Sequence, residues 1–403
     1  MSRPTVVLVG TLDTKGEEYA YLRERLEEAG VDTLLVDVGT QGPPLARADV
    51  SREDVAAAGG FDLASLTDRG AAVQAMCAAA PRVVRRLFDE GRCQGVLAAG
   101  GSGNTAIATA AMRALPVGVP KLVVSTMAAG DTTAYVDVSD VTLMPAVTDV
   151  AGLNSVSARI LANAAAAVAG MVTAPPVELG SSRPVLAATM FGVTTPAVTA
   201  AREELERRGY EVLVFHATGT GGRSMESLVE AGFVTGVLDL TTTELADDLV
   251  GGVLSAGPHR LEAAGRRGVP QVVSLGALDM VNFGPRESVP ARFAGRNLYV
   301  HNPSVTLMRT TPEECAELGR RLGAKLSAAT GPVALFVPLR GVSAISGEGG
   351  PFFDPEADAA LLAGLRETLD PSVEVHEVDA HVNDPAFAVA MAGRLDEFLG
   401  GAR

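Results

Sequence analysis

The stretch TVVLVGTLDTKGEEYAYLRERLEEAGVDTLLVDV, residues 5–38, decides the fold. Its first six residues are a β-branched run ending at Gly10, as expected of a strand buried on both faces. In residues 17–29, apolar side chains recur three and four positions apart between charges, which indicates an amphipathic helix that ends at Gly30. Residues 31–38 form a second apolar run. Strand, helix and strand at this spacing predict a βαβ unit with parallel strands.

The same plan returns in the second half of the chain, where Gly209 takes the place of Gly30. Three shorter matches follow in the same order in both halves. They are GVL at 95–97 and 236–238, GVPKLVVS at 118–125 with GVPQVVS at 268–274, and VTLM at 141–144 and 305–308. These matches predict an α/β fold of two similar doubly wound, Rossmann-like parallel-sheet domains. We expect them at residues 1–177 and 184–403, joined by a Pro-, Ser- and Gly-containing linker at 173–183, with residues from 332 onward as an α/β extension of the second.

Composition limits the possible partners. The 403 residues contain 33 Lys and Arg against 48 Asp and Glu, a net charge of −15. This balance argues against nucleic acid and anionic membranes, because neutralising phosphates requires clustered basic side chains. Small anions are still allowed, since loop amides and helix N-termini can hold them. Three scattered cysteines without a CxxC pair, together with an N-terminus that lacks a signal-peptide pattern, predict a cytoplasmic protein.

Glycine-rich loops after predicted strands are the candidate ligand sites of the first half. Gly100–Thr105 (GGSGNT) follows one strand and opens a helix, so its bare amides and hydroxyls favour an anion such as phosphate. A simple glycine-rich turn is the alternative. Gly10–Gly16 places Asp13 beside Lys15. Lys15 could reach a phosphate and Asp13 could hold magnesium or a ribose hydroxyl, or the pair could merely cap a helix. Asp131, after a later strand, could likewise be a ligand group or a helix cap.

The second half has similar loops. Thr218–Gly222 (TGTGG) suits an anion or carboxylate, and Glu226 is placed in the first turn of the next helix, as a general base or as an acid that complements the helix dipole. Asp279 and Asn282 stand among apolar residues, where a polar pair is costly unless it serves a ligand or a hydrogen-bonded hinge, and we expect a functional role. Neither HExxH nor GxSxG is present, which argues against a zinc or serine hydrolase.

Ten motifs in order, among them GTLDTKGEE, AAGGSGNTA, STMAAGDTTAYV, FHATGTGGRSME and GALDMVNFG, resemble the Tm-1-like ATP-binding domain family. That family comprises bacterial proteins similar to the N-terminal domain of a plant protein that inhibits tobamovirus RNA replication, an activity that is not carried over. The resemblance implies two Rossmann-like subdomains, ATP or ADP with magnesium in the loops, and a homodimer or higher homo-oligomer. It marks residues 10–16, 100–105 and 126–132 as nucleotide-facing, although Asn104 stands where members often have glycine.

Two functions are compatible with these features. One is an ATP- and Mg-dependent enzyme, of the phosphoryl- or adenylyl-transfer or ligase type, acting on a small carboxylate metabolite between the halves. The other is a non-catalytic nucleotide-binding regulatory or interaction protein; an NAD dehydrogenase is disfavoured by the missing GxGxxG. The residues expected to act are Lys15, Glu226 and Asp279 in catalysis; Asp13 and Asp131 at the metal; Gly10, Thr11, Asp13, Thr14, Lys15, Gly100, Gly101, Ser102, Gly103, Asn104, Thr105, Thr126, Gly130, Asp131 and Thr132 at the nucleotide; and His216, Thr218, Gly219, Thr220, Gly221, Gly222 and Asn282 at a second ligand.

Overall fold

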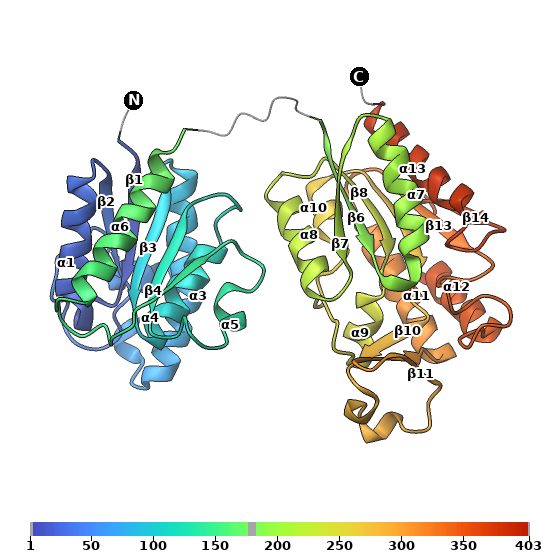
Figure 1. The fold of residues 1–403 in the computed structure, drawn as a ribbon, viewed down its shortest axis with the longest axis horizontal. Coiled ribbons are helices and arrows are strands. Elements are labelled where there is room, and N and C mark those ends of the chain that lie inside the picture. The colour runs from blue at the N-terminus through green and yellow to red at the C-terminus, as the bar shows by residue number, and fades with distance from the viewer. Residues whose placement is uncertain (1–2, 176–182, 402–403) are drawn as a thin grey trace. The chain divides into compact units, whose positions relative to one another are not determined.

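The computed structural model describes residues 3–175 and 183–401, and the chain divides into two compact units, residues 1–178 and 179–403 (Figure 1). Each unit is described by itself below. Of the predicted linker, residues 176–182 lie outside the described residues, and Thr173 is the last residue of a helix. None of the helices in the described ranges combines the length and apolar character that crossing a bilayer requires.

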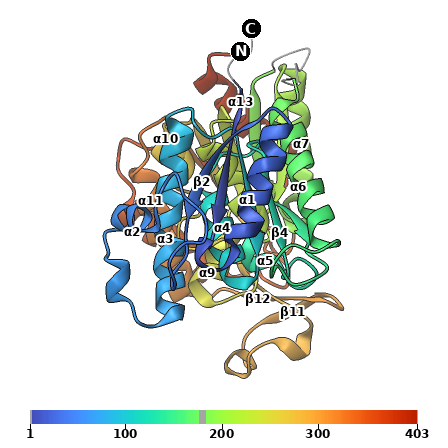
Figure 2. The same ribbon diagram turned by 90° about the vertical axis from the view of Figure 1, so that its left-hand side faces the viewer.

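The first unit is built on a five-stranded parallel sheet in the order β2-β1-β3-β4-β5. Its strands are β1 (Thr5–Gly10), β2 (Asp32–Asp37), β3 (Gly95–Gly100), β4 (Lys121–Ser125) and β5 (Thr142–Pro145). Its helices are α1 (Leu12–Glu28), α2 (Arg52–Gly59), α3 (Arg69–Asp89), α4 (Ser102–Arg113), α5 (Thr133–Val136) and α6 (Ser157–Thr173). Apolar side chains of α1 and α6 pack on one face of the sheet and those of α2, α3 and α4 on the other, which makes the sheet doubly wound (Figure 2).

The second unit repeats this plan on a six-stranded parallel sheet in the order β14-β13-β9-β8-β6-β7. Its strands are β6 (Val185–Met190), β7 (Glu211–His216), β8 (Gly236–Thr241), β9 (Gln271–Gly276), β13 (Val333–Pro338) and β14 (Glu374–Val378). Its helices are α7 (Thr195–Arg207), α8 (Thr220–Glu230), α9 (Glu244–Val250), α10 (Ala263–Arg267), α11 (Pro312–Ser327), α12 (Pro355–Thr368) and α13 (Pro385–Leu399). Helices α7 and α13 cover one face, and the remaining helices cover the other. The predicted fold of two similar doubly wound α/β domains is therefore confirmed.

One of the internal matches is wrong in structural terms. The GVL and GVP segments do occupy corresponding strands, β3 with β8 and β4 with β9. The VTLM segments do not, because the first forms β5 at the parallel edge of its sheet. The second forms β12 (Val305–Arg309), which pairs antiparallel with β10 (Met280–Phe283) and β11 (Leu298–Asn302) in a separate small sheet. Apolar and β-branched residues suit either kind of strand, so four letters cannot distinguish them.

The strand order places one crevice in each unit. From β1 the chain moves to β2 on one side, and the following strand, β3, lies on the other side of β1. Ligands of open parallel sheets bind beyond the carboxyl ends of the strands at such a reversal. The corresponding reversal in the second unit lies between β6 and β8. These two positions are called the first and the second crevice below.

Candidate functional site

The first crevice is a cavity of about 230 Å³ at the carboxyl ends of β1 and β3. It brings together two of the three loops that the family resemblance marked as nucleotide-facing, the one after β1 and the one after β3. Residues from the loop after β2, from the start of α3 and from the segment after β5 complete it. The lining residues are Thr11, Asp13, Thr14, Lys15, Thr40, Gln41, Arg69, Val73, Gly101, Ser102, Gly103, Asn104 and Asp149.

The amino end of α4 opens into this crevice. Its N-cap residue is Gly101, and no side chain caps the helix. Among the described residues, no acceptor is found for the amides of Ser102, Gly103 and Asn104. A Cβ atom added to Gly101 would meet nothing closer than the Thr126 hydroxyl at 3.9 Å, so the space above this turn is open. The arrangement leaves three N–H groups and the positive end of a helix dipole available to an anion.

Two cations flank the open helix end. Lys15 lies at a kink in α1, with non-helical φ and ψ of −128° and 22°, and Arg69 is the first residue of α3. Within residues 3–175 and 183–401, neither side chain makes a hydrogen bond or an ion pair. Most other arginines of the protein are paired with carboxylates. The two unpaired charges therefore add to the attraction of the α4 amino end for anions.

The loops around the crevice are held by buried polar side chains. Asn104 accepts a hydrogen bond from the Thr11 amide at 3.0 Å and donates to the Tyr19 hydroxyl and the Ala99 carbonyl, both at 3.1 Å. It thereby joins the loop after β1 to the start of α4. The fully buried Thr105 hydroxyl lies 2.6 Å from that of Ser125, which joins the first turn of α4 to the end of β4. Asn104 and Thr105, predicted as nucleotide contacts, thus use their side chains to fix the loops.

The two predicted metal ligands lie in different surroundings. Asp13 lines the first crevice, and its Oδ2 accepts hydrogen bonds from the amides of Thr40 and Gln41 at 3.1 and 2.8 Å. Its Oδ1 takes no hydrogen bond from the described residues. Asp131 is exposed, lies outside the lining of the crevice, and accepts a hydrogen bond from the Thr133 amide at 3.0 Å, which lowers the pKa of its carboxyl. The structure therefore does not bring the two carboxylates together in the first crevice.

The remaining first-unit predictions divide by location. Thr11, Thr14, Lys15, Gly101, Ser102 and Gly103 line the first crevice, as Asp13 and Asn104 do. Thr126 lines a neighbouring cavity, whereas Gly10 and Gly100 end buried strands and Gly130, Asp131 and Thr132 line neither cavity. The lining residues Thr40, Gln41, Arg69 and Asp149 were not among the predicted site residues. Thr40 and Gln41 lie in a Gly- and Pro-containing loop after a predicted strand, and Asp149 lies in VTDVAGLN, another of the motifs that carry the family resemblance.

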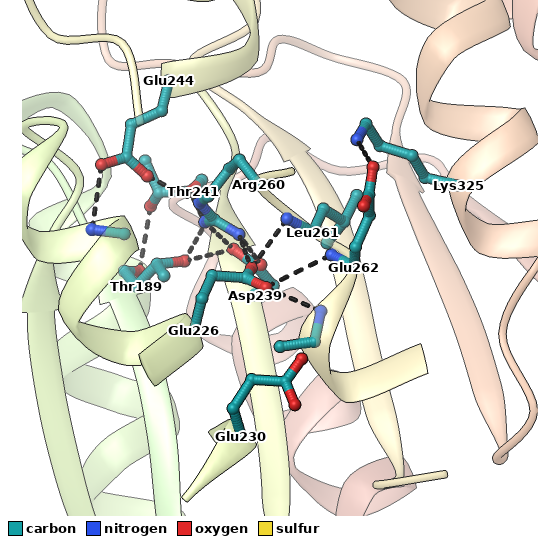
Figure 3. Close-up of polar contacts among 12 residues, drawn as sticks. Thr189, Glu226, Glu230, Asp239, Thr241, Glu244, Arg260, Leu261, Glu262 and Lys325 are labelled. Atoms are coloured by element: carbon teal, nitrogen blue, oxygen red, sulfur yellow. Dashed lines mark hydrogen bonds and ion pairs between the residues drawn. The ribbon is translucent and has the colours of Figure 1, made fainter. Parts of the chain in front are cut away.

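In the second unit the corresponding crevice is filled by the protein's own side chains (Figure 3). Arg260 is 1% exposed and forms a two-point ion pair with the buried Asp239, at 2.5 and 2.7 Å. Asp239 also accepts a hydrogen bond from the Thr189 hydroxyl at 2.7 Å, and the Thr194 and Thr241 hydroxyls lie 2.7 Å apart. Burial alone would lower the pKa of Arg260, but its carboxylate neighbours raise that pKa, so it stays charged.

Glu244 supplies the anion for the predicted TGTGG loop. Helix α8 begins at Thr220, and the Oε1 atom of Glu244 accepts hydrogen bonds from the amides of Gly219 and Gly222 at 2.7 and 3.0 Å. Its Oε2 accepts one from Arg260 at 2.7 Å. A Cβ atom on Gly222 would lie 2.1 Å from Glu244, so glycine is needed for this approach. The loop does recognise a carboxylate, as its composition suggested, but the carboxylate belongs to the chain itself.

Glu226 stabilises a helix end. Contrary to the sequence-based placement in a first turn, it lies well inside α8. Its two carboxylate oxygens accept hydrogen bonds from the amides of Leu261 and Ala263, both at 2.7 Å, at the start of α10. Arg260 lies 3.4 Å from the same carboxylate (Figure 3). These contacts correspond to the dipole-complementing alternative, although the acid complements a neighbouring helix and not its own.

The other predicted residues of the second unit are dispersed. Asp279 is buried, accepts a hydrogen bond from Ser343 at 2.7 Å, and leaves its Oδ1 without a partner among the described residues. Burial raises its pKa to about 6, against the opposing effects of Arg309 and Ser343. Asn282 donates to Asp247 at 2.6 Å in the interior, whereas His216 is exposed at the end of β7. The structure does not assemble Glu226, Asp279 and the TGTGG loop into one pocket.

A further cavity of about 680 Å³ lies at the carboxyl end of β13, beside the start of α12. Its walls are mainly apolar, with Leu275, Val337 and Phe353 among them, and Arg340 and His381 also line it. His381 donates from Nε2 to the Ser343 carbonyl at 2.9 Å and accepts from the Asn383 amide at Nδ1. None of the residues predicted to contact a second ligand lines this cavity.

The chain matches two domain families along nearly all of its length. The N-terminal domain of the uncharacterised protein family UPF0261 matches residues 4–176, and its C-terminal domain matches residues 183–399. A UPF0261 protein of Clostridium tetani is 51% identical over 394 residues, covering 97% of this chain and 98% of that protein. A UPF0261 protein of Rhizobium meliloti is 52% identical over 390 residues, covering 96% of each.

A plant relative confirms the resemblance found in the motifs. The ToMV resistance protein Tm-1(GCR237) of Solanum lycopersicum is 40% identical over 421 residues, which cover 98% of this chain and 55% of the tomato protein. The two domain matches and these relatives agree with the fold, in which each matched domain corresponds to one compact unit. The chain belongs to the UPF0261 family, which includes relatives of the tomato Tm-1 proteins.

Proposed function

We propose that this protein binds ATP in the first crevice. The observation that carries the proposal is the uncapped amino end of α4 between Lys15 and Arg69, two cations without an ion partner in the described parts of the chain. Bare amides, a helix dipole and two unpaired cations are the groups that hold the phosphates of a nucleotide. The second crevice supports the assignment by contrast, because there a carboxylate of the chain already satisfies the amides.

Magnesium fits this site as a partner of the phosphates. Within residues 3–175 and 183–401, no group of three or more His, Cys, Asp and Glu side chains is placed to hold a metal alone. Mg²⁺ at nucleotide sites commonly takes one or two carboxylates, phosphate oxygens and water. The Oδ1 atom of Asp13 is a protein oxygen in the first crevice that would hold it. When bound, the ion would neutralise phosphate charge, while Lys15 and the α4 amides would hold the phosphate oxygens.

Binding without turnover is the form of this function that the contacts favour. The catalytic base expected in the second unit, Glu226, is engaged by two amides of α10, and Asp279 is buried beside Ser343. An ATP- and Mg-dependent transfer to a small metabolite is the second candidate, supported by Lys15 at the first crevice. The three free cysteines fit a reducing compartment, so we propose a cytoplasmic location for either activity.

The test is titration of the full chain with Mg-ATP, followed by calorimetry and thermal unfolding. Wild-type protein should bind, and at a ligand concentration of 100 Kd its first unit should gain about 2.7 kcal/mol. The variant Gly101→Val should fold normally, because Gly101 has φ −83° and ψ −167°, which valine adopts readily, and there is space for the side chain. It should not bind, because its side chain would occupy the phosphate position.

The matched control is Gly170→Ala, a glycine of α6 with nothing near its added Cβ atom. It should bind as the wild type does. Unchanged binding by Gly101→Val would contradict the proposed phosphate position, and failure of the wild type to bind would contradict the function. Consumption of ATP in the presence of a panel of small carboxylates, followed as formation of ADP or of AMP and pyrophosphate, separates the enzyme from the binding protein.

A further inference from the structure

A second cavity adjoins the first crevice. It has a volume of about 390 Å³ and lies at the carboxyl ends of β4 and β5. Asp149 lines both cavities, and Thr126 on its wall is the residue whose hydroxyl would face a side chain added at Gly101. Lys15 and Arg69 line only the first crevice. A ligand that reaches from one cavity into the other would therefore meet the two cations at one end and pass Asp149 on the way.

The second cavity differs from the first crevice in its chemistry. Its wall consists of small, apolar and hydroxyl-bearing residues, and Asp149 is the one charged residue among them. The residues are Ser125, Thr126, Ala129, Pro145, Ala146, Val147, Thr148 and Asp149. Val147 has a φ of 62°, which β-branched residues rarely adopt, and its apolar side chain is 81% exposed. Such a wall suits an uncharged, flat group better than a phosphate.

Two oxygen atoms of residues that line this cavity have no hydrogen-bond partner among the described residues. The Oγ1 atom of Thr148 is buried and has no hydrogen-bond partner among the described residues. Asp149 accepts a hydrogen bond from the Val150 amide at Oδ1, at 2.9 Å, and its Oδ2 takes none from the residues described. An ionised carboxylate only accepts hydrogen bonds, and it repels phosphate. A neighbouring pair of hydroxyls is the group that satisfies it.

We propose that the segment Ala146–Asp149 is the nucleoside subsite of the ATP site, with Asp149 binding the ribose hydroxyls. Thr148 supplies a further hydrogen-bonding group, and the side chain of Val147 covers the base. This inference rests on the proposed function, because it assigns the phosphates to the α4 end. It makes the site selective for ribonucleotides through a residue that does not contact phosphate.

The experiment compares three ligands by calorimetry on the full chain: ATP, 2′,3′-dideoxy-ATP and inorganic tripolyphosphate. The variant is Asp149→Asn, which keeps an acceptor for the Val150 amide. ATP should bind this variant about tenfold more weakly, as expected for lost hydrogen bonds to a charged acceptor. Dideoxy-ATP should bind wild type about tenfold more weakly than ATP does, and the variant should not weaken it further. Tripolyphosphate should bind the variant as tightly as wild type or more tightly, because a negative charge has been removed.

The matched control is Asp32→Asn, which removes the same charge from an exposed residue that lines neither cavity. It should bind all three ligands as the wild type does. Equal binding of ATP and dideoxy-ATP by wild type, or equal weakening of all three ligands by Asp149→Asn, would overturn the subsite while leaving ATP binding intact. If none of the three ligands binds wild type, the proposed function itself fails, and the subsite fails with it.

Discussion

Glu244 accepts a 2.7 Å hydrogen bond from the backbone amide of Gly219, and this contact distinguishes the two units of the chain. At the amino end of α8 the negative charge comes from a side chain, whereas the amino end of α4 has no capping side chain. The two crevices lie at equivalent reversals of strand order. Their difference therefore arises from side chains and not from the fold, and it can be tested residue by residue.

Glu244→Ala should destabilise the second unit by about 3 kcal/mol. The change leaves two amides and one guanidinium nitrogen of the buried Arg260 without an acceptor, and uncompensated buried groups are costly. Glu244→Gln keeps an oxygen that can accept from the amides, so its loss of stability should be about half that of the alanine variant. Hydrogen exchange of the full chain measures both, with peptides of the first unit as the internal control. A loss below about 1 kcal/mol for the alanine variant would contradict the role assigned to Glu244.

Glu226→Gln should lower the stability around α10 by about 1 kcal/mol and leave ATP binding unchanged. The glutamine can still accept from one amide, but it loses the charge that complements the start of α10. Urea unfolding and ATP titration of the same preparation measure the two effects. A variant with wild-type stability and no catalytic turnover would instead return Glu226 to the role of general base.

Asp279 should make the second unit less stable as the pH rises from about 4 to 7. Its pKa is about 6 in the folded protein and about 3.9 in an unfolded chain, so folding favours the protonated form. The contribution of Asp279 to the unfolding free energy is fully present below the pKa of the unfolded chain and is lost as the pH rises through 6. The unfolding free energy of Asp279→Asn, relative to that of the wild type, should therefore increase by up to about 3 kcal/mol between pH 4 and pH 7. Urea unfolding at four pH values measures this difference.

Asp247 should make the unfolding free energy of the second unit decrease with pH up to about pH 7, above the pKa of Asp279. Burial raises its pKa to about 7, opposed by hydrogen bonds from Asn282, and the nearby Glu244 raises it further. The unfolding free energy of Asp279→Asn should therefore still decrease between pH 6 and pH 7. A flat profile of that variant across this interval would show that Asp247 titrates at its ordinary value.

Lys15→Met and Arg69→Met should each weaken ATP binding about tenfold at low salt, since each removes one charged contact to phosphate. Both side chains line the first crevice without an ion partner in the described ranges, so neither change breaks an existing pair. The dependence of binding on salt should also become less steep, because fewer charges take part. Arg286→Met, which removes the same charge in the second unit, is the control. Unaltered affinity in both test variants would contradict the phosphate position.

The sequence predicts the sheets well because their strands are buried on both faces. β1 has the predicted bounds, Thr5–Gly10, since a continuous apolar run leaves little choice of register or face. The helix after it begins at Leu12 and not at residue 17, because a kinked first turn at Lys15 precedes the regular amphipathic part. The small antiparallel sheet was not predicted, because β12 contains the same tetrapeptide, VTLM, as the segment that forms a parallel strand in the first unit.

The first crevice was predictable in part and the second was not. Glycines after β3 and an acid–base pair after β1 mark their loops by local chemistry, so Gly101 and Lys15 could be found from the sequence. Arg69 and Asp149 come from distant segments that only the folded sheet brings together. The contact of Glu244 with Gly219 could not be predicted for the same reason, since it spans 25 residues and depends on where α9 begins. Composition indicated that an anion belongs at TGTGG, but not which anion.

The anion position at the amino end of α8 is occupied by the carboxylate of Glu244. Because this carboxylate satisfies the amides, the amino end of α8 needs no external anion. If the first crevice binds nucleotide as proposed, the first unit would become more stable as the nucleotide concentration rises. The two units would then differ in whether their stability depends on that concentration.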